Sequence, residues 1–222
     1  TLLFTFISSL LQIASSLLVG YGFARFKFPL KNALFMLVIF TLVVPPQTII
    51  TPLYLNFRNF AGTGLNLLNT VFPFGILGIT AMGLKNGLYI FMIRQFYRNV
   101  PKELEEAAMI DGAGFLRTFV SVMLPNATSP FIVISMLSFI WYWNDTFYSN
   151  ILMRNKMMLA NKIANIQELI RLSFSGQARG DGATETVIIF AAALLFIIPP
   201  LIIYLIAQRF FMESVERTGI VG

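Results

Sequence analysis

The stretch PKELEEAAMIDGAG, Pro101 to Gly114, is the polar exception in an apolar chain. Four acidic residues fall within its positions 103–111, among alanines and two glycines. A charged side chain at the centre of a membrane span costs about 2.5–3.5 kcal/mol, so this stretch is expected in water. Pro101 suits a first helical turn, and acids after it favour the positive end of the helix dipole. The stretch therefore predicts a polar helix outside the membrane.

This helix is expected to end at Asp111-Gly112, because glycine permits left-handed backbone angles. A second short helical piece should follow and end at Leu124-Pro125. The segment 96–127 is thus predicted to be a helix, a tight turn and another helix. It is either a solvated loop without a partner or a docking element, in which Ala107 and Ala108 let another surface come close and Glu105 and Glu106 face a basic partner.

The composition around this segment is that of a membrane protein. The chain has 222 residues, of which 57% are hydrophobic and 12% charged, and its mean hydropathy is +0.76. Soluble domains carry about 25% charged residues. We predict an all-α fold, a polytopic transmembrane bundle in one domain, 1–222. The absence of Cys and His excludes disulfides and Cys/His metal sites, and no metal site is expected.

Five apolar segments are long enough to span a bilayer. They are expected at 1–23, 33–55, 70–95, 128–149 and 186–208. The second contains VVPPQ, 43–47, where we expect the helix to unwind. If the first span begins on the external side of the membrane, we expect at least one more span upstream of residue 1.

Basic residues set the predicted orientation. The short loop ARFKFPLKN holds Arg25, Lys27 and Lys31, and short basic loops are typically cytoplasmic. We therefore attribute the net charge of +6 to Lys and Arg in cytoplasmic loops and not to nucleic-acid binding. Alternation then makes 96–127 and the tail 209–222 cytoplasmic and 150–185 external. The external assignment conflicts with five basic residues in that loop, and we expect an amphipathic surface helix within it.

The stretch EAAMIDGAGFLRTFVSVMLP resembles the EAA signature of permease subunits in ATP-binding-cassette importers, E-A-A-x3-G-x9-I-x-L-P. The matching residues are Glu106, Ala107, Ala108, Gly112, Leu124 and Pro125, and Val122 replaces the usual Ile. The flanks GYGFARFKF and QRFFMESVERTGIVG resemble the carbohydrate-importing branch, particularly the maltose-permease G-subunit group. The resemblance covers nearly the whole chain.

The resemblance implies a function for the polar segment. The family's EAA loop is a coupling helix that sits in a cleft of a cytoplasmic ATPase, so Glu106 would pair with a basic group there and Gly112 would make the bend. The implied partners are a second permease subunit, two ATPase subunits and an external solute-binding protein. The substrate would be a carbohydrate, in this branch an oligosaccharide, and the location would be the bacterial cytoplasmic (inner) membrane. ATP and Mg would be bound by the ATPase, and no cofactor by this chain.

The tail TGIVG resembles the end of the same subunit group, which reaches the ATPase interface. Gly219 and Gly222 are the candidate contacts. The usual form has a Gly and a Lys that this chain lacks. The alternative is a frayed terminus, which is common at chain ends.

Two features within the spans are candidates for a substrate pathway. Lys85 and Asn86 are predicted near the middle of the third span, where an ionisable group marks a pathway or a partner; a pathway Lys85 would suit an acidic sugar. The alternatives are an internal ion pair and a lysine that snorkels near a kink, since Gly83 and Gly87 make a local distortion plausible. The outer end of the fourth span carries FIWYWNDTFYSN, with Trp141, Trp143, Asn144 and Asp145. These residues either contact sugar or form an interfacial aromatic belt.

Other classes of protein fit less well. The chain lacks the phosphate-loop pattern GxxxxGK[ST], so no ATP hydrolysis is expected from it. An ion-coupled secondary transporter would favour paired repeats and acid relays in the membrane, and the sequence has neither. It remains the main alternative, with a membrane scaffold as a second.

Overall fold

A computed structural model of the chain describes residues 1–156, 158–173 and 182–219. The described residues form helices and no strand, in agreement with the predicted all-α fold. The helices in chain order are α1 (Leu2–Arg25), α2 (Lys31–Val43), α3 (Pro46–Arg58), η1 (Phe60–Gly62), α4 (Phe72–Ile79), α5 (Asn86–Asn99), α6 (Glu103–Ile110), α7 (Phe115–Thr118), η2 (Phe119–Met123), α8 (Leu124–Asn126), α9 (Thr128–Trp143), α10 (Phe147–Leu152), α11 (Leu159–Ala164), α12 (Ile166–Ser173) and α13 (Gly182–Gly219).

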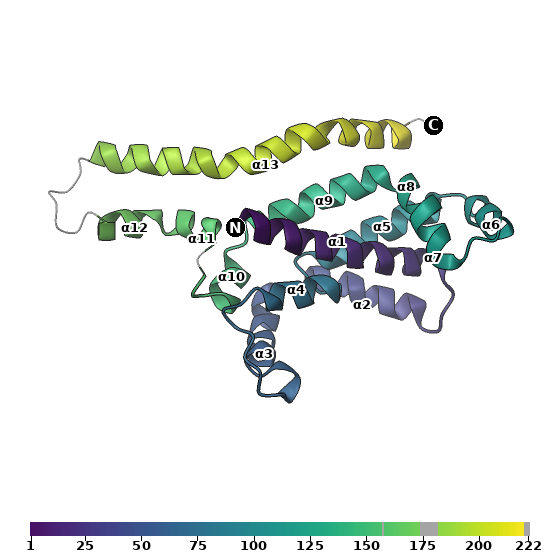
Figure 1. The fold of residues 1–222 in the computed structure, drawn as a ribbon, viewed down its shortest axis with the longest axis horizontal. Helices are drawn as coiled ribbons and strands as arrows, with labels where there is room; N and C mark the ends of the chain where they lie inside the picture. Colours follow the sequence, from purple (N-terminus) through teal and green to yellow (C-terminus); the bar gives the residue numbers. More distant parts are fainter. Residues whose placement is uncertain (157, 174–181, 220–222) are drawn as a thin grey trace.

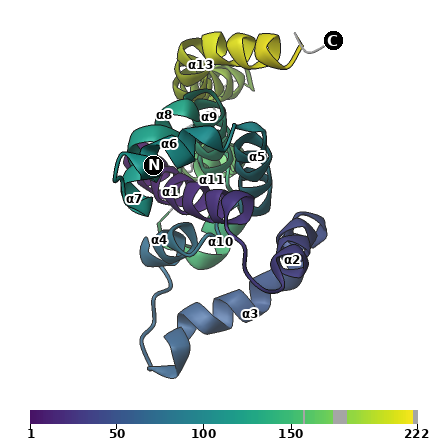
Figure 2. The same cartoon turned by 90° about the vertical axis from the view of Figure 1, so that its right-hand side faces the viewer.

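Helix α1 lies at the centre of the bundle and packs against α4, α5 and α9 (Figures 1 and 2). Its apolar residues Ile13, Leu17 and Tyr21 join the core formed with α5, η2 and α9. The same helix also buries a row of polar side chains, which are Thr5, Ser8, Ser9, Gln12, Ser15 and Ser16. A membrane helix that buries so many hydroxyls and an amide must have polar partners on its neighbours.

Those partners lie where the expected span 70–95 is interrupted. The expected span 70–95 is not one continuous helix, because α4 ends at Ile79 and α5 begins at Asn86. Between them, Ala81 and Lys85 have left-handed backbone angles, each with φ of 57°. Such a break leaves carbonyl groups without helical donors, and lipid supplies none.

Side chains of α1 donate to the exposed groups of this break. The Ser15 hydroxyl donates to the carbonyl of Gly78 at 2.6 Å, and the Gln12 amide donates to the carbonyl of Leu84. The Ser16 hydroxyl donates to Oδ1 of Asn86 at 2.8 Å. Polar side chains in the centre of α1 thus stabilise a discontinuous neighbour.

The expected span 33–55 is also broken, as VVPPQ predicts. Helices α2 and α3 meet at 104°, and Val44 between them is extended, with ψ of 121°. A residue before proline avoids helical angles, and proline has no N–H to continue the ladder. The two adjacent prolines therefore turn α3 away from α2 (Figure 2).

The last two expected spans correspond to long helices. The segment 128–149 is divided into α9 and the short α10, and 186–208 lies inside α13. Helix α13 runs beside α9, while α11 and α12 lie at the end of the bundle opposite α6 (Figure 1). One amphipathic surface helix is expected within the loop 150–185. The structure has two short helices there, α11 and α12, which are separated at Asn165.

By length and apolarity, α1 and residues 182–210 of α13 can each cross a membrane. Two bent pairs qualify as well if each counts as one span: α2 with α3, and residues 115–126 with α9 at 81°. The described residues thus contain two to four candidate spans, and the α4–α5 region is a discontinuous fifth segment.

Replacing Asn86 with leucine tests the importance of the break. Asn86 Nδ2 donates to the carbonyl of Ala81 at 2.6 Å, and the buried leucine would leave that carbonyl without a donor. Side-chain hydrogen bonds between membrane helices are worth about 0.6–2 kcal/mol each, so Asn86→Leu should lower the free energy of unfolding by about 1–3 kcal/mol. Denaturant titration in detergent measures this change.

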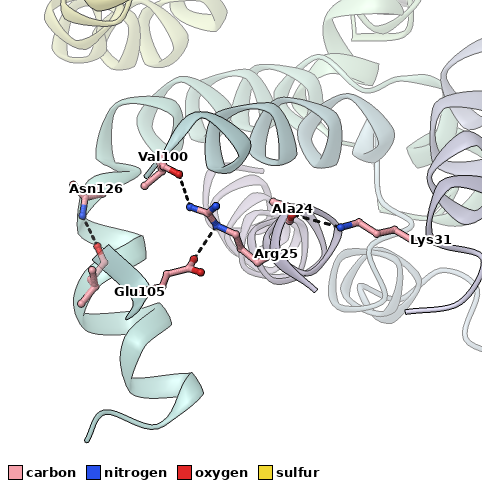
Figure 3. Close-up of polar contacts among 7 residues, drawn as sticks. Ala24, Arg25, Lys31, Val100, Glu105 and Asn126 are labelled. Carbon is pink, nitrogen blue, oxygen red and sulfur yellow. Dashed lines mark hydrogen bonds and ion pairs between the residues drawn. The ribbon is translucent and has the colours of Figure 1, made fainter. Parts of the chain in front are cut away.

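The matched control is Asn126→Leu. Asn126 is exposed and donates only to the carbonyl of Val122 within its own segment (Figure 3), so its loss should change the free energy by less than about 0.5 kcal/mol. Equal effects of the two substitutions would show that the α4–α5 break does not need Asn86.

Candidate functional site

The segment from α6 to α8 protrudes from one end of the bundle (Figure 1). Helix α6 carries Glu103, Glu105 and Glu106 in its first turn, where acids complement the helix dipole. It ends at Ile110 and is capped by Asp111, and Gly112 follows with φ of 80° and no atom within 4 Å of where a Cβ would stand. The predicted helix, tight turn and second helix is therefore confirmed, with the turn made by a left-handed glycine.

An ion pair fastens α6 to the central helix. Arg25, the last residue of α1, places Nε 2.9 Å from Oε1 of Glu105 and donates from Nη2 to the carbonyl of Val100 at 2.7 Å (Figure 3). The two side chains are only 6% and 12% exposed. A buried charge without its partner is costly, so the pair fixes the position of α6 relative to α1 and α5.

This geometry corrects the expectation for Glu105. The sequence suggested that Glu105 and Glu106 both face an outside partner, but Glu105 points inward to Arg25. Glu106, Ala107 and Asp111 are exposed, and Ala108 is partly buried. In the sequence, Arg25 indicates only the orientation of the chain in the membrane. Nothing in the local sequence indicates that it reaches the polar helix.

A cluster of aromatic rings supports the second half of the loop. Tyr21 of α1 packs against Phe119 at 4.9 Å, Tyr97 at 5.2 Å and Phe115 at 5.7 Å between ring centroids. Phe26 lies 4.5 Å from Phe115. Aromatic pairs at such distances contribute beyond their buried area. Helix α7 and η2 are thereby seated on the same end of α1 as the ion pair.

The outer surface of the loop is apolar next to its acids. Ile110 is 85% exposed and Leu116 is 72% exposed, and Met109 is exposed as well. Leu124 is partly buried and Pro125 exposed; both lie in α8, directly before the 81° bend into α9. An exposed apolar patch edged by charge is typical of a protein-binding surface.

At the α4–α5 break, the structure brings two of the predicted pathway residues together. Lys85 precedes α5 in a left-handed conformation, and its Nζ lies 4.8 Å from the centroid of the Trp141 ring. Both side chains are exposed, Trp141 by 43%. An ammonium over an indole is an attractive cation–π pair that leaves the remaining N–H donors of the lysine free for a ligand.

The other predicted pathway residues have structural contacts. Asn86 is buried and bonded within the break. Trp143 is 2% exposed and donates from Nε1 to the carbonyl of Phe196 in α13 at 3.1 Å. Asp145 accepts the backbone N–H groups at the start of α10. Asn144 is exposed but donates to the carbonyl of Ile140 in its own helix.

Two further predictions concern the tail and metals. Gly219 is the last residue of α13, and Gly222 lies outside the described residues. Within the described ranges, no three His, Cys, Asp or Glu side chains gather in a way that could hold a metal ion.

Together, the fold and the protruding polar loop define a helical integral membrane protein. The model of the family described as "Binding-protein-dependent transport system inner membrane component" matches residues 16–217, and the chain belongs to this family. Members are components of the inner membrane, in agreement with the predicted location.

Curated relatives have names that fit this family. A probable ABC transporter permease of Pyrococcus horikoshii is 31% identical over 207 residues, covering 93% of this chain and 68% of the relative. The sn-glycerol-3-phosphate transport system permease protein UgpE of Yersinia pestis is 32% identical over 203 residues, covering 91% and 66%. The chain thus spans about two thirds of the length of these relatives.

A solved structure has the same fold. It is the crystal structure of a bacterial ABC transporter involved in the import of the acidic polysaccharide alginate. The TM-score is 0.65 at 21% identity, over 94% of this chain and 73% of the other.

Replacing Arg25 tests the fastening of α6. Arg25→Gln leaves the Glu105 carboxylate buried without a cation, which should destabilise the protein by about 3 kcal/mol. The free energy of unfolding in detergent measures this loss, and the rate of proteolytic cleavage within 101–114 reports whether α6 detaches. Glu106→Gln is the control, since Glu106 is exposed and should leave both readouts unchanged. If Arg25→Gln and Glu106→Gln behave alike, the ion pair does not hold the loop.

Proposed function

We propose that this chain is a permease subunit of a binding-protein-dependent, ATP-driven importer of carbohydrates. It forms half of the translocation pathway together with a second permease subunit. Two ATPase subunits bind ATP and Mg on the cytoplasmic side, and an external solute-binding protein delivers the substrate. The chain performs no hydrolysis itself.

The observation that carries this proposal is the protruding loop of α6, Gly112 and α7. Its exposed surface, which faces away from the bundle, carries Glu106, Ala107 and the apolar Ile110 and Leu116. Its opposite side is fastened to α1 by the Arg25–Glu105 pair and by Tyr21. A helix with one face docked on an ATPase and the other fixed to the bundle transmits movement between them.

In this mechanism, closure of the ATPase dimer moves α6, and α6 carries the end of α1 with it. Stiff helices can convert such a displacement into a change between two packings of the bundle. The bundle would then switch between states open inward and outward. The tail residues Gly219 and Gly222 would add a second contact with the ATPase.

We further propose that the substrate is acidic, in the class of an anionic oligosaccharide. Exposed Lys85 beside Trp141 offers an ammonium and an aromatic face at the α4–α5 break, a combination that suits a negatively charged sugar. UgpE is named for a phosphate ester, and the solved structure for an acidic polysaccharide. Asn144, directly after α9, is also exposed and polar.

The coupling mechanism is tested by Gly112→Val. Valine resists left-handed angles, at a cost of about 1–2 kcal/mol, so the turn after α6 should distort. Uptake by the reconstituted transporter should fall by about tenfold or more, while the ATPase still hydrolyses ATP. Radiolabelled substrate uptake and phosphate release, measured in the same vesicles, separate the two effects.

Two control variants make this result specific. Gly114→Ala changes a glycine with ordinary φ of −68° and open space around it, and it should leave uptake intact. Gly112→Asn should retain most uptake, because asparagine tolerates left-handed angles. Normal uptake by Gly112→Val would contradict the proposal.

The substrate proposal is tested by Lys85→Met. Loss of the ammonium should reduce uptake of an acidic oligosaccharide at least about tenfold, because a charge-assisted contact is removed, with ATPase activity preserved. Lys85→Arg should retain transport, and Lys162→Met is the control for removal of an exposed cation from the outer loop. If Lys85→Met takes up the acidic oligosaccharide as fast as wild type does, the role of Lys85 is refuted. A neutral sugar measured in parallel shows whether any loss is specific to the acidic one.

A further inference from the structure

Three basic residues lie where α2 packs against α5, at the end of the bundle that carries α6. Lys31 begins α2, and Phe35 lies one turn further along the same face. The guanidinium of Arg94 on α5 stands 3.8 Å from the centroid of the Phe35 ring. Arg98 follows one turn after Arg94 on α5, which packs against α2. Burial, and then the positive charges of both arginines, lower the pKa of the Lys31 ammonium. We call Lys31, Arg94 and Arg98 the basic cluster.

In the part of the chain that the structure describes, no acid forms an ion pair with the basic cluster. The first acidic residue of the sequence is Glu103, and Glu105 is paired with Arg25. Among the described residues, neither Arg94 nor Arg98 has an ion pair, and Arg94 Nε is buried without a hydrogen-bond acceptor. Lys31 donates to backbone carbonyls, at 3.4 Å to that of Ala24 (Figure 3) and at 2.8 Å to that of Phe26. Like charges held together with an unsatisfied buried N–H favour an anionic ligand.

The surface next to the basic cluster is apolar. Beside Lys31 on α2, Leu30 is 74% exposed, Leu34 43% and Leu37 61%. This face continues directly from the charged start of the helix into the membrane-spanning part. A ligand that fits both surfaces has an anionic end and a hydrocarbon body, which is the chemistry of an acidic phospholipid.

We propose that the basic cluster binds the phosphate headgroup of an anionic phospholipid whose acyl chains lie along the exposed face of α2. The cluster joins the beginning of α2 to the end of α5, at the same end of the bundle as the Arg25–Glu105 pair. Basic pockets between membrane helices on the cytoplasmic side recognise such headgroups. The bound lipid would hold α2 against α5, where cations otherwise repel each other.

Native mass spectrometry of the full-length protein in detergent tests this site. Apparent dissociation constants are measured for phosphatidylglycerol and for phosphatidylcholine with the same acyl chains. Each basic residue near an anionic surface contributes about a fivefold effect, so Arg94→Gln with Arg98→Gln should weaken phosphatidylglycerol binding about 30-fold. Binding of phosphatidylcholine should not change.

Matched variants separate a built site from general charge. Arg94→Lys with Arg98→Lys keeps both charges and should retain most of the preference. Arg58→Gln with Arg154→Gln removes two exposed cations elsewhere and should have less than about a threefold effect. The single variant Arg98→Gln alters an exposed side chain and should weaken binding about fivefold; it carries the test if the double variant does not fold.

Four results would overturn the proposal. The first two are undiminished phosphatidylglycerol binding by both glutamine variants of the cluster, and an equal loss of binding by Arg58→Gln with Arg154→Gln. The third is displacement of the lipid by millimolar inorganic phosphate. The fourth is loss of assembly with another subunit while lipid binding is unchanged. The last two would indicate a soluble-anion site and a protein interface, respectively. None of these readouts requires transport, so they are independent of the proposed function.

Discussion

The structure depends on one constraint, which is that a helix interrupted inside an apolar bundle needs hydrogen-bond donors from its neighbours. The α4–α5 break exposes carbonyls and holds two residues in left-handed angles. Gln12, Ser15 and Ser16 of α1 bond to groups at this break. Because lipid offers no alternative partner, the polar face of α1 and the interruption require each other. Lys85 reaches Trp141 only because the break places it at the start of α5.

The other end of α1 carries the second fixed point of the molecule. Arg25 and Tyr21, one turn apart, hold α6 and η2 respectively. One continuous helix therefore connects the candidate substrate residues with the candidate coupling loop. In the proposed importer, a displacement of α6 would reach the α4–α5 break through α1 without an intervening flexible link.

Much of this architecture could be predicted from patterns within short windows. Hydropathy predicts the membrane helices, adjacent prolines predict the bend after Val43, and Pro101 with Asp111-Gly112 predicts the polar helix and its turn. The glycines around Lys85 indicate a local distortion, but the α4–α5 interruption has no adjacent prolines to mark it, and its left-handed residues, Ala81 and Lys85, are not glycines. Its stabilising partners lie on α1, far away in the sequence. The polar residues of α1 recur at helical spacing and so share one face, but this spacing does not show which helix they meet.

By itself, the sequence determined that the chain is a helical membrane protein with a polar helix–turn–helix outside the lipid, because apolar length and charge cost are properties of each segment alone. Only the tertiary structure decided which side of that polar helix is available to a partner. Adjacent residues on a helix point about 100° apart, so Glu105 and Glu106 face different surroundings. Glu105 meets Arg25 and is buried, while Glu106 remains exposed. The difference arises from the position of the end of α1, which no pattern in the loop itself encodes.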